Sequence, residues 1–318
     1  MTPAPPEGED LGPLKRGDRR VLARVLSVVE RGGEASREVA DLVQASGTDP
    51  RSVGITGAPG AGKSTLTNAL LSELRESDEI VAVLAVDPTS PITGGAILGD
   101  RVRMQSHATD SGVFIRSMAS RGHLGGLSLA TPEAVRVLGY AGWPTVFIET
   151  VGVGQIEVDI AGAADTTVVV VNPGWGDSVQ ANKAGLLEVA DIFVINKADR
   201  VGADEAERDL VMMLELGAHK AWTPPILKTV ATTGAGVTEL AAALTEHWDW
   251  MHETGELERR RVRRATSELR EILLRHLGLK VDSVLSDRAV KQRLSGASAS
   301  LYALADELLA SNSWGSGE

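Results

Sequence analysis

The chain has 318 residues, 43% of them hydrophobic and 24% charged, which is typical of a soluble globular protein with one large domain or two. A formal charge of −11 argues against nucleic acid as a partner, and the lack of cysteine excludes disulfides, thiolate metal sites and cysteine nucleophiles. No stretch reaches the roughly 18 uninterrupted apolar residues of a membrane span, and residues 1–20 lack the apolar core of a signal peptide. We therefore expect a cytoplasmic protein with no membrane partner.

The N-terminal segment predicts a tail followed by helices. Residues 1–12 are rich in proline and acids, which predicts disorder. Apolar residues then recur at helical spacing and predict two short amphipathic helices joined at residues 31–35. These apolar residues are Leu22, Val25, Leu26, Val29, Val39, Leu42 and Val43. We expect residues 1–48 to form a tail and a helical extension that packs against the next domain or covers it.

The segment GAPGAGKST, residues 57–65, matches the phosphate-binding pattern GxxxxGK[ST]. Its glycines let backbone N–H groups close around phosphate oxygens, and the following helix adds the positive end of its dipole. Lys63 would neutralise phosphate charge, and Ser64 would offer its hydroxyl to Mg²⁺. An apolar strand at 52–56 and a helix at 63–74 provide the flanks that such a loop needs. The predicted nucleotide-binding residues here are Gly57, Ala58, Pro59, Gly60, Ala61, Gly62, Lys63, Ser64 and Thr65.

A continuous apolar run at 80–88 predicts a buried parallel strand. Asp87 lies at its carboxyl end, where open α/β sheets gather their ligands, although a turn-forming Asp is the alternative. Residues 89–112 mix glycine, proline and charge and predict a mobile loop that contains Asp100, with a short strand following at 113–115.

Residues 144–150 predict another strand, which is followed by VGVGQ. Glu149 therefore falls where acids that hold Mg²⁺ or position water lie in phosphate-loop enzymes. The glycines of VGVGQ permit backbone movement near a γ-phosphate, and Gln155 is a candidate for orienting water. The motif departs from the DxxG of small GTPases.

Strands are also predicted at 165–173 and 190–199, and the second contains Asn196-Lys197-Ala198-Asp199. A buried carboxylate at the fourth position accepts two hydrogen bonds from guanine, whereas adenine offers no matching donor pair. A simple strand-ending turn is the alternative. After a helix at 203–217 and a strand at 225–230, the backbone amide of Ala231 is a further candidate contact for guanine.

The rest of the chain reads as helical, over 237–252, 255–277, 286–295 and 298–311. The basic run at 259–264 follows three glutamates, so we interpret it as a solvated, salt-bridged helix face rather than a nucleic-acid patch. Apolar residues share one face of this tail and must pack on the core or on a second copy. They are Leu269, Ile272, Leu273 and Leu277.

Together these elements predict an α/β fold: a P-loop NTPase whose mostly parallel sheet is flanked by helices, with N-terminal and C-terminal helical extensions. The expected domains are the extension at 1–48, a GTPase domain at 49–250 and a C-terminal helical dimerisation extension at 251–318.

The motifs GAPGAGKST, VDPTS, ILGDRVRM, ETVGVGQ, GDSVQANKAG and NKAD, within residues 50–240, resemble those of the MeaB/ArgK family, the methylmalonyl-CoA mutase-associated GTPases. The resemblance implies a homodimeric GTPase with low turnover that uses GTP/GDP and Mg²⁺. It also implies a chaperone role, in which the protein gates adenosylcobalamin loading and protects or reactivates an adenosylcobalamin-dependent acyl-CoA mutase.

Carried over by motif, the resemblance assigns roles to individual residues. The metal and γ-phosphate would be surrounded by Ser64, Asp87, Asp100 and Glu149. Guanine would be recognised by Asn196, Lys197 and Asp199. ILGDRVRM and ETVGVGQ look like the two nucleotide switches, and GDSVQANK looks like a further switch through which Gln180 and Lys183 couple to the partner. The sequence departs from the family at Val230-Ala231, where a serine-alanine pair is usual.

The proposed reaction is in-line attack of water on the γ-phosphate, with Lys63, Glu149 and Gln155 as catalytic candidates and no evident general base. A nickel-insertion metallochaperone GTPase is one alternative, but this chain has no cysteine and only six scattered histidines. An ATP-dependent transport-associated kinase is another, against which NKAD argues. A pure nucleotide-binding scaffold is the third.

Overall fold

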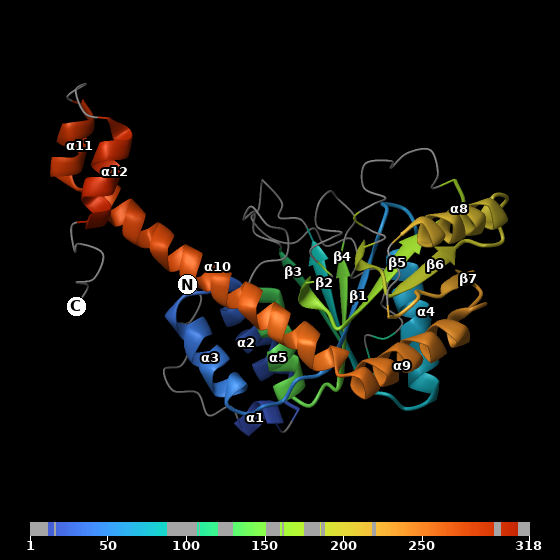
Figure 1. The fold of residues 1–318 in the computed structure, drawn as a ribbon. Coiled ribbons are helices and arrows are strands. Elements are labelled where there is room, and N and C mark those ends of the chain that lie inside the picture. The colour runs from blue at the N-terminus through green and yellow to red at the C-terminus, as the bar shows by residue number, and fades with distance from the viewer. Residues whose placement is uncertain are drawn as a thin grey trace. The chain divides into compact units, whose positions relative to one another are not determined.

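A computed structural model describes residues 12–15, 17–87, 107, 109–119, 130–150, 160, 162–174, 185, 188–217, 221–295 and 300–310 (Figure 1). The predicted disorder of the first residues lies outside this part of the chain. The chain divides into two compact units, Met1–Arg261 and Val262–Glu318.

The first unit is built on a seven-stranded sheet in which every neighbouring pair of strands is parallel, in the order β3-β2-β4-β1-β5-β6-β7. The strands are β1 (Arg51–Gly57), β2 (Val81–Asp87), β3 (Val113–Ala119), β4 (Thr145–Thr150), β5 (Thr166–Val171), β6 (Ile192–Asn196) and β7 (Ile226–Thr229). The central β1 pairs with β4 and β5. The loop after β1 is therefore in the middle of the carboxyl edge, where parallel sheets bind ligands.

Helices cover both faces of the sheet (Figure 1). Those of the first unit are α1 (Gly12–Lys15), α2 (Arg19–Arg31), α3 (Glu34–Gln44), α4 (Lys63–Glu76), α5 (Ala130–Tyr140), α8 (Ala203–Leu216) and α9 (Val237–Thr254). Val168 and Val170 of β5 pack with α4 and α9, whereas Val169 and Val171 pack with α8. The α8 face is continued over β2, β3 and β4 by α2, α3 and α5. The strands are thus buried on both sides, which explains their unbroken aliphatic runs. The P-loop α/β fold predicted from the sequence is confirmed.

The N-terminal helices belong to this packed core. Asp18 begins α2 as its N-cap, where its carboxylate accepts from the N–H groups of Arg20 and Val21. Most of the predicted apolar face, including Leu22 and Leu26, is buried in the same cluster as α5 and β4, but Leu42 of α3 is 54% exposed, contrary to the prediction. The helices therefore form a layer over the sheet.

Three elements differ from the sequence prediction. Helix α5 was not predicted at all. Strand β3 continues past Ile115 to Ala119, since Arg116, which interrupts its apolar pattern, forms an ion pair with Glu30 of α2 at 3.0 Å. Helix α10 (Glu256–Ser286) runs without a break through Gly278, where we expected an end. A glycine within a helix costs only about 1 kcal/mol, which a long helix tolerates.

The second unit contains most of α10 together with α11 (Arg288–Ser295) and α12 (Leu301–Ala310). Val290 and Leu304 are buried, but many apolar side chains of α10 are exposed. They are Val262, Leu269, Ile272, Leu273, Leu274, Leu277, Leu279 and Leu285. In the described part of the chain, none of the helices combines the length and apolar character that crossing a membrane requires.

Candidate active site

The loop between β1 and α4 depends on two glycines with positive φ. Gly57 has φ 133° and Gly62 has φ 94°, values that residues with a Cβ rarely adopt. A Cβ at Gly57 would clash with the carbonyl oxygen of Val170, and a Cβ at Gly62 would clash with the side-chain amide of Asn196. Both glycines therefore allow the loop to approach neighbouring backbone and side chains closely, as a phosphate cradle requires.

The first turn of α4 opens onto this loop. Gly62 caps the helix, and among the described residues no side chain caps it through a hydrogen bond. The positive end of the helix dipole therefore lies at this loop, where it favours an anion. The Lys63 ammonium donates to the carbonyls of Gly57 at 2.7 Å and Ala58 at 3.2 Å, and the side chain is buried. The loop therefore holds one positive charge against its own backbone.

A hydroxyl and a carboxylate lie together beside the phosphate loop. Ser64 Oγ donates to Glu149 Oε1 at 2.5 Å, and both residues are buried. The sheet brings them together because β4, which carries Glu149, pairs directly with β1. Hydroxyl and carboxylate oxygens are the hard ligands that Mg²⁺ prefers, so this donor set fits the metal.

Asn196 joins three loops into one network. Its Nδ2 donates to the carbonyl of Ala61 at 2.9 Å, and its Oδ1 accepts from Thr229 Oγ1 and from the backbone N–H of Ala231, each at 3.2 Å. Lys197, with φ 58°, adds a second connection, since its ammonium donates to the carbonyl of Gly60 at 2.6 Å. The NKAD segment thus supports the phosphate loop directly. Sequence reasoning missed this supporting role and the part of Thr229.

Asp199 is exposed at the same edge of the sheet, and not buried as expected. A bound base would have to cover this carboxylate to desolvate it. Other predicted residues are not located by the structure. Asp87 ends β2, whose Val86 pairs with Thr150 of β4, but its side chain lies outside the described part of the chain. Also outside the described residues are Asp100, Gln155, Gln180, Lys183 and the VGVGQ segment.

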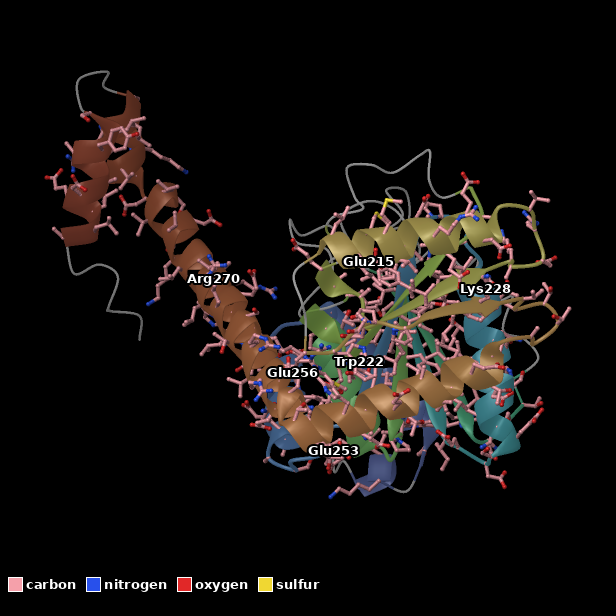
Figure 2. All side chains as sticks on the ribbon, turned by 45° about the vertical axis from the view of Figure 1, so that its right-hand side comes forward. Glu215, Trp222, Lys228, Glu253, Glu256 and Arg270 are labelled. Atoms are coloured by element: carbon pink, nitrogen blue, oxygen red, sulfur yellow. The ribbon has the colours of Figure 1, made fainter. Side chains whose placement is uncertain are left out.

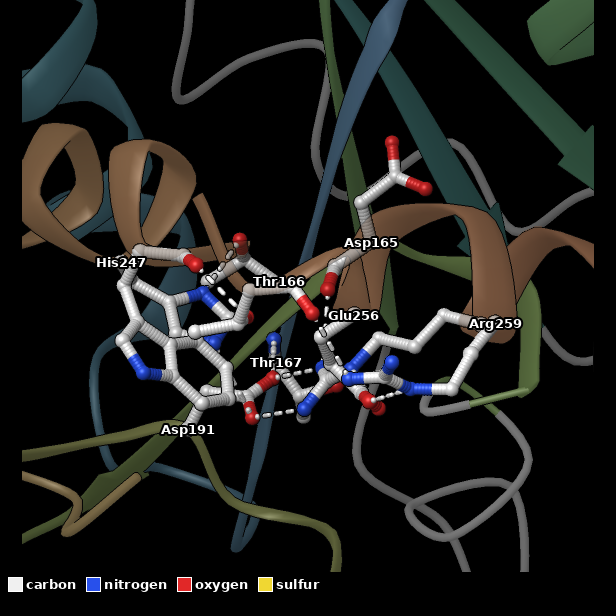
Figure 3. A network of polar contacts seen from close by, with 10 residues as sticks. Asp165, Thr166, Thr167, Asp191, His247, Glu256 and Arg259 are labelled. Atoms are coloured by element: carbon white, nitrogen blue, oxygen red, sulfur yellow. Dashed lines mark hydrogen bonds and ion pairs between the residues drawn. The ribbon is translucent and has the colours of Figure 1, made fainter. Parts of the chain in front are cut away.

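A second polar network lies at the amino ends of the strands, opposite the phosphate loop (Figure 3). It was not predicted from the sequence. Asp165 and Asp191 immediately precede β5 and β6. Arg260, at the start of α10, donates to both carboxylate oxygens of Asp191 at 2.7 and 2.8 Å, and Arg261 donates to Asp165 at 3.2 Å. The sequence pattern that could have predicted this network is an aspartate directly before each of two apolar strands, together with the Arg260-Arg261 pair.

Two of the arginines in the basic run are therefore docked on the core. Arg259 fits the prediction of an exposed, salt-bridged residue, because it pairs with Glu256 at 2.9 Å and is largely exposed. Arg260 and Arg261 are only about one-fifth exposed, at 23% and 22%. The expectation of a solvated face is thus wrong for these two residues, because the buried aspartates draw them onto the sheet.

Burial gives His247 of α9 an unusual pKa within this network. Its Nδ1 is hydrogen-bonded to Thr166 Oγ1 at 2.9 Å, and its Nε2 lies 3.4 Å from Asp191 Oδ1. Burial lowers the pKa of His247 to about 4, against the opposing attraction of Asp191. Burial also acts to lower the pKa of Arg260, but its hydrogen bonds and attraction to Asp191 outweigh that effect and raise it. His247 is therefore neutral near pH 7.

The parallel sheet, the glycine loop after its central strand and the NKAD segment beside that loop define a protein of the P-loop GTPase class. The family model described as "Methylmalonyl Co-A mutase-associated GTPase MeaB" matches residues 22–284, and the chain belongs to this family. The family membership inferred from the motifs is confirmed.

Relatives and a solved structure agree with this assignment. A Pyrococcus horikoshii protein that carries a GTPase name is 51% identical over 278 residues, covering 86% of this chain and 88% of the relative. The GTPase ArgK of Escherichia coli is 35% identical over 299 residues, covering 90% and 89% of the two chains. The crystal structure of a LAO/AO transport system kinase superposes with a TM-score of 0.70 at 25% identity, covering 94% and 91%.

In the part of the chain that the structure describes, no group of three or more His, Cys, Asp or Glu side chains is placed to hold a metal ion.

Proposed function

We propose that this protein is a Mg²⁺-dependent GTPase that acts as a chaperone of an adenosylcobalamin-dependent acyl-CoA mutase such as methylmalonyl-CoA mutase. It gates cofactor loading and protects or reactivates the mutase. The observation that carries the GTPase part is the Asn196 network, which ties the phosphate loop, the NKAD segment and the Ala231 amide into one site. The name of the family supports the mutase as partner.

Different residues of the chain bind the phosphates and the base of GTP. Backbone N–H groups of residues 60–65 hold the phosphates, and Lys63 leaves the carbonyls of Gly57 and Ala58 to neutralise the β- and γ-phosphates. The Asp199 carboxylate accepts from guanine N1–H and N2–H₂. The Ala231 amide, which donates to Asn196 Oδ1 in this structure, turns to the guanine oxygen when the base binds.

Hydrolysis is in-line attack of water on the γ-phosphorus. The bond from phosphorus to the bridging oxygen breaks, and GDP and phosphate are released. Ser64, Glu149, Asp87 and Asp100 would hold Mg²⁺, which when bound neutralises charge that develops on the phosphate oxygens. Gln155 orients the water. Without an evident general base the intrinsic turnover is low, and the partner stimulates it.

The proposal also covers the dimerisation segment and the domain boundaries. Residues 251–318 form a dimerisation extension, and the exposed apolar side chains of α10 support this assignment because such a surface is unfavourable in water. The GTPase domain is residues 49–250, the extension is 1–48, and the protein acts in the cytoplasm.

Transfer of adenosylcobalamin to the mutase tests this function. The purified chain is mixed with a mutase and its cofactor-loading enzyme, and the cobalamin spectrum is followed with GDP, GTP or a non-hydrolysable GTP analogue, with and without EDTA. We expect the nucleotide state to control transfer, and Lys63→Ala to remove that control. If transfer is the same in every nucleotide state, or if no such mutase binds, the chaperone role is wrong.

A further inference from the structure

Helix α2 contacts both ends of β3, the edge strand of the sheet. At the start of the helix, the Arg19 guanidinium donates to three backbone carbonyls at 2.7 to 3.0 Å, those of Asp110, Ser111 and Val113. Near the end of the helix, Glu30 Oε1 accepts from the backbone N–H of Ala119 at 3.0 Å. One side chain of α2 thus binds the amino end of the strand, and another binds its carboxyl end.

The Glu30 carboxylate is held in place for this contact. Its second oxygen, Oε2, pairs with Arg116 of the same strand at 3.0 Å, and Arg116 also donates to Ser27 Oγ at 3.0 Å. The side chains of Arg116 and Glu30 are only 17% and 16% exposed, so water weakens this pair less than it weakens a surface pair. Hydrogen bonds from a neutral donor to a charged acceptor are also stronger than neutral ones.

Ala119 is the last residue of β3, and it pairs with Asp87, the last residue of β2. Neighbouring strands are about 5 Å apart, so a restraint on Ala119 acts on the backbone beside Asp87. Among the described residues no strand pairs with the other side of β3, because β3 is the first strand of the sheet. Glu30 therefore supplies the acceptor that an edge strand would otherwise take from water.

We infer that Glu30 is a positioning residue for the metal and γ-phosphate side of the nucleotide site. It holds the last pair of residues in the β2–β3 ladder and so limits the positions open to Asp87. This inference rests on the proposed function, which places Asp87 next to Mg²⁺. The phosphate loop and NKAD follow β1 and β6, which do not pair with β3, so binding of the base and of GDP without metal is independent of Glu30.

The test compares Glu30→Ala with Arg19→Gln in the full chain. Arg19 is a matched control, because it joins the same helix to the same strand at the opposite end. Two quantities are measured: the Mg²⁺ concentration that gives half-maximal GTP hydrolysis, and the affinity for GDP in EDTA. We expect Glu30→Ala to raise the Mg²⁺ requirement about tenfold, as loss of a residue that orients a metal ligand does. GDP affinity in EDTA should stay within about twofold, as for a residue remote from the bound group.

Two further variants separate positioning from simple stabilisation. Glu30→Gln keeps an oxygen that accepts from Ala119, so its Mg²⁺ requirement should stay near the wild-type value. Arg19→Gln should lower the melting temperature without changing the Mg²⁺ requirement. If Glu30→Ala does not fold, Glu30→Asp takes its place, with hydrogen exchange at Ala119 reporting whether the contact is lost.

Several results would overturn the inference. One is an equal shift of the Mg²⁺ requirement in Glu30→Ala and Arg19→Gln. Another is a Glu30 variant whose Ala119 amide exchanges freely but whose Mg²⁺ requirement stays at the wild-type value. A fall in GDP affinity that matches the rise in Mg²⁺ requirement would also overturn it. Absence of Mg²⁺-dependent GTP hydrolysis in the wild-type chain would instead refute the proposed function, so the two failures are distinguishable.

Discussion

Asn196 and Ala61 are 135 residues apart in sequence, yet the side-chain amide of Asn196 donates to the backbone carbonyl of Ala61 at 2.9 Å. The bond is buried and joins the end of β6 to the phosphate loop. Gly62 is adjacent, and a Cβ there would clash with the same amide. The shape of the phosphate loop and the position of the NKAD segment therefore depend on each other.

Replacement of Asn196 tests this dependence. Asn196→Ala leaves the Ala61 carbonyl and the Ala231 amide without the side chain that bonds both of them. We therefore expect the free energy of unfolding to fall by about 1–3 kcal/mol. GTP affinity should fall at least about tenfold, because phosphate and base contacts are disturbed together. Calorimetry and urea unfolding measure both. Asn172→Ala is the control and should change neither strongly, because in the described part of the chain it removes a single 3.1 Å bond to the carbonyl of Pro173.

Lys63→Ala should abolish detectable GTP binding, because the phosphates lose the ammonium that the loop places beside them. Lys228, an exposed lysine labelled in Figure 2, provides the control. It pairs with Asp204 and Glu207, and Lys228→Ala should bind GTP normally. Titration calorimetry with GTP and ATP gives both affinities. Equal wild-type affinity for the two nucleotides would refute the assignment to guanine.

Asp199→Asn should shift preference from guanine to xanthine nucleotides. The amide supplies a donor where the carboxylate only accepts, and xanthine has an oxygen at the position of the guanine amino group. We expect GDP affinity to fall at least about tenfold while XDP affinity rises. Because Asp199 is exposed, the melting temperature should not change. Retention of GDP preference in this variant would show that another group recognises the base.

His247 predicts a pH dependence of stability. Its pKa is about 4 in the folded protein and about 6.5 when unfolded, so the unfolded chain binds more protons between these values. The contribution of His247 to stability is therefore complete above about pH 6.5 and is lost as the pH falls toward 4. Urea unfolding between pH 8 and 5 measures the slope. His247→Gln should flatten it, and His252→Gln, an exposed histidine of the same helix, should not.

Arg260→Met should strongly destabilise the first unit. The side chain of Asp191 is only 6% exposed, and without Arg260 its charge stays buried without its main partner. Breaking such a pair costs about 3–5 kcal/mol. Arg259→Met, on the same turn but 58% exposed, should change the free energy of unfolding by less than about 1 kcal/mol. Chemical denaturation compares the two, and similar losses would show that Arg260 has no special structural role.

Local pattern was enough to predict most of the fold. The aliphatic runs that became β1, β2, β4, β5 and β6 were recognisable because a parallel sheet buries both faces, which removes alternation. The strict spacing of glycines, Lys63 and Ser64 predicted the loop, since few backbones other than a phosphate loop need that combination. The place of Glu149 beside the phosphate loop could be predicted because the carboxyl ends of neighbouring parallel strands lie at the same side of a sheet.

Other features depended on contacts between distant residues and could not be predicted. The polar Arg116 within β3 is neutralised by Glu30, which lies 86 residues earlier in the chain. Arg260 looked solvated because its partner, Asp191, is 69 residues away in sequence. Asp199 was expected to be buried but is exposed. The exposure of a residue after a strand depends on which loops surround it, and the sequence of the strand does not specify that.

The sequence by itself determined the class of fold, the kind of loop that meets phosphate and the family, because these depend on residue type and short spacing. Only the tertiary structure decided that Asn196 and Lys197 support the phosphate loop and that Glu30 holds the edge strand beside Asp87. It also decided that buried aspartates hold the start of α10. The physical reason is that hydrogen bonds and ion pairs between elements depend on distance and burial, which residue spacing along the chain does not specify.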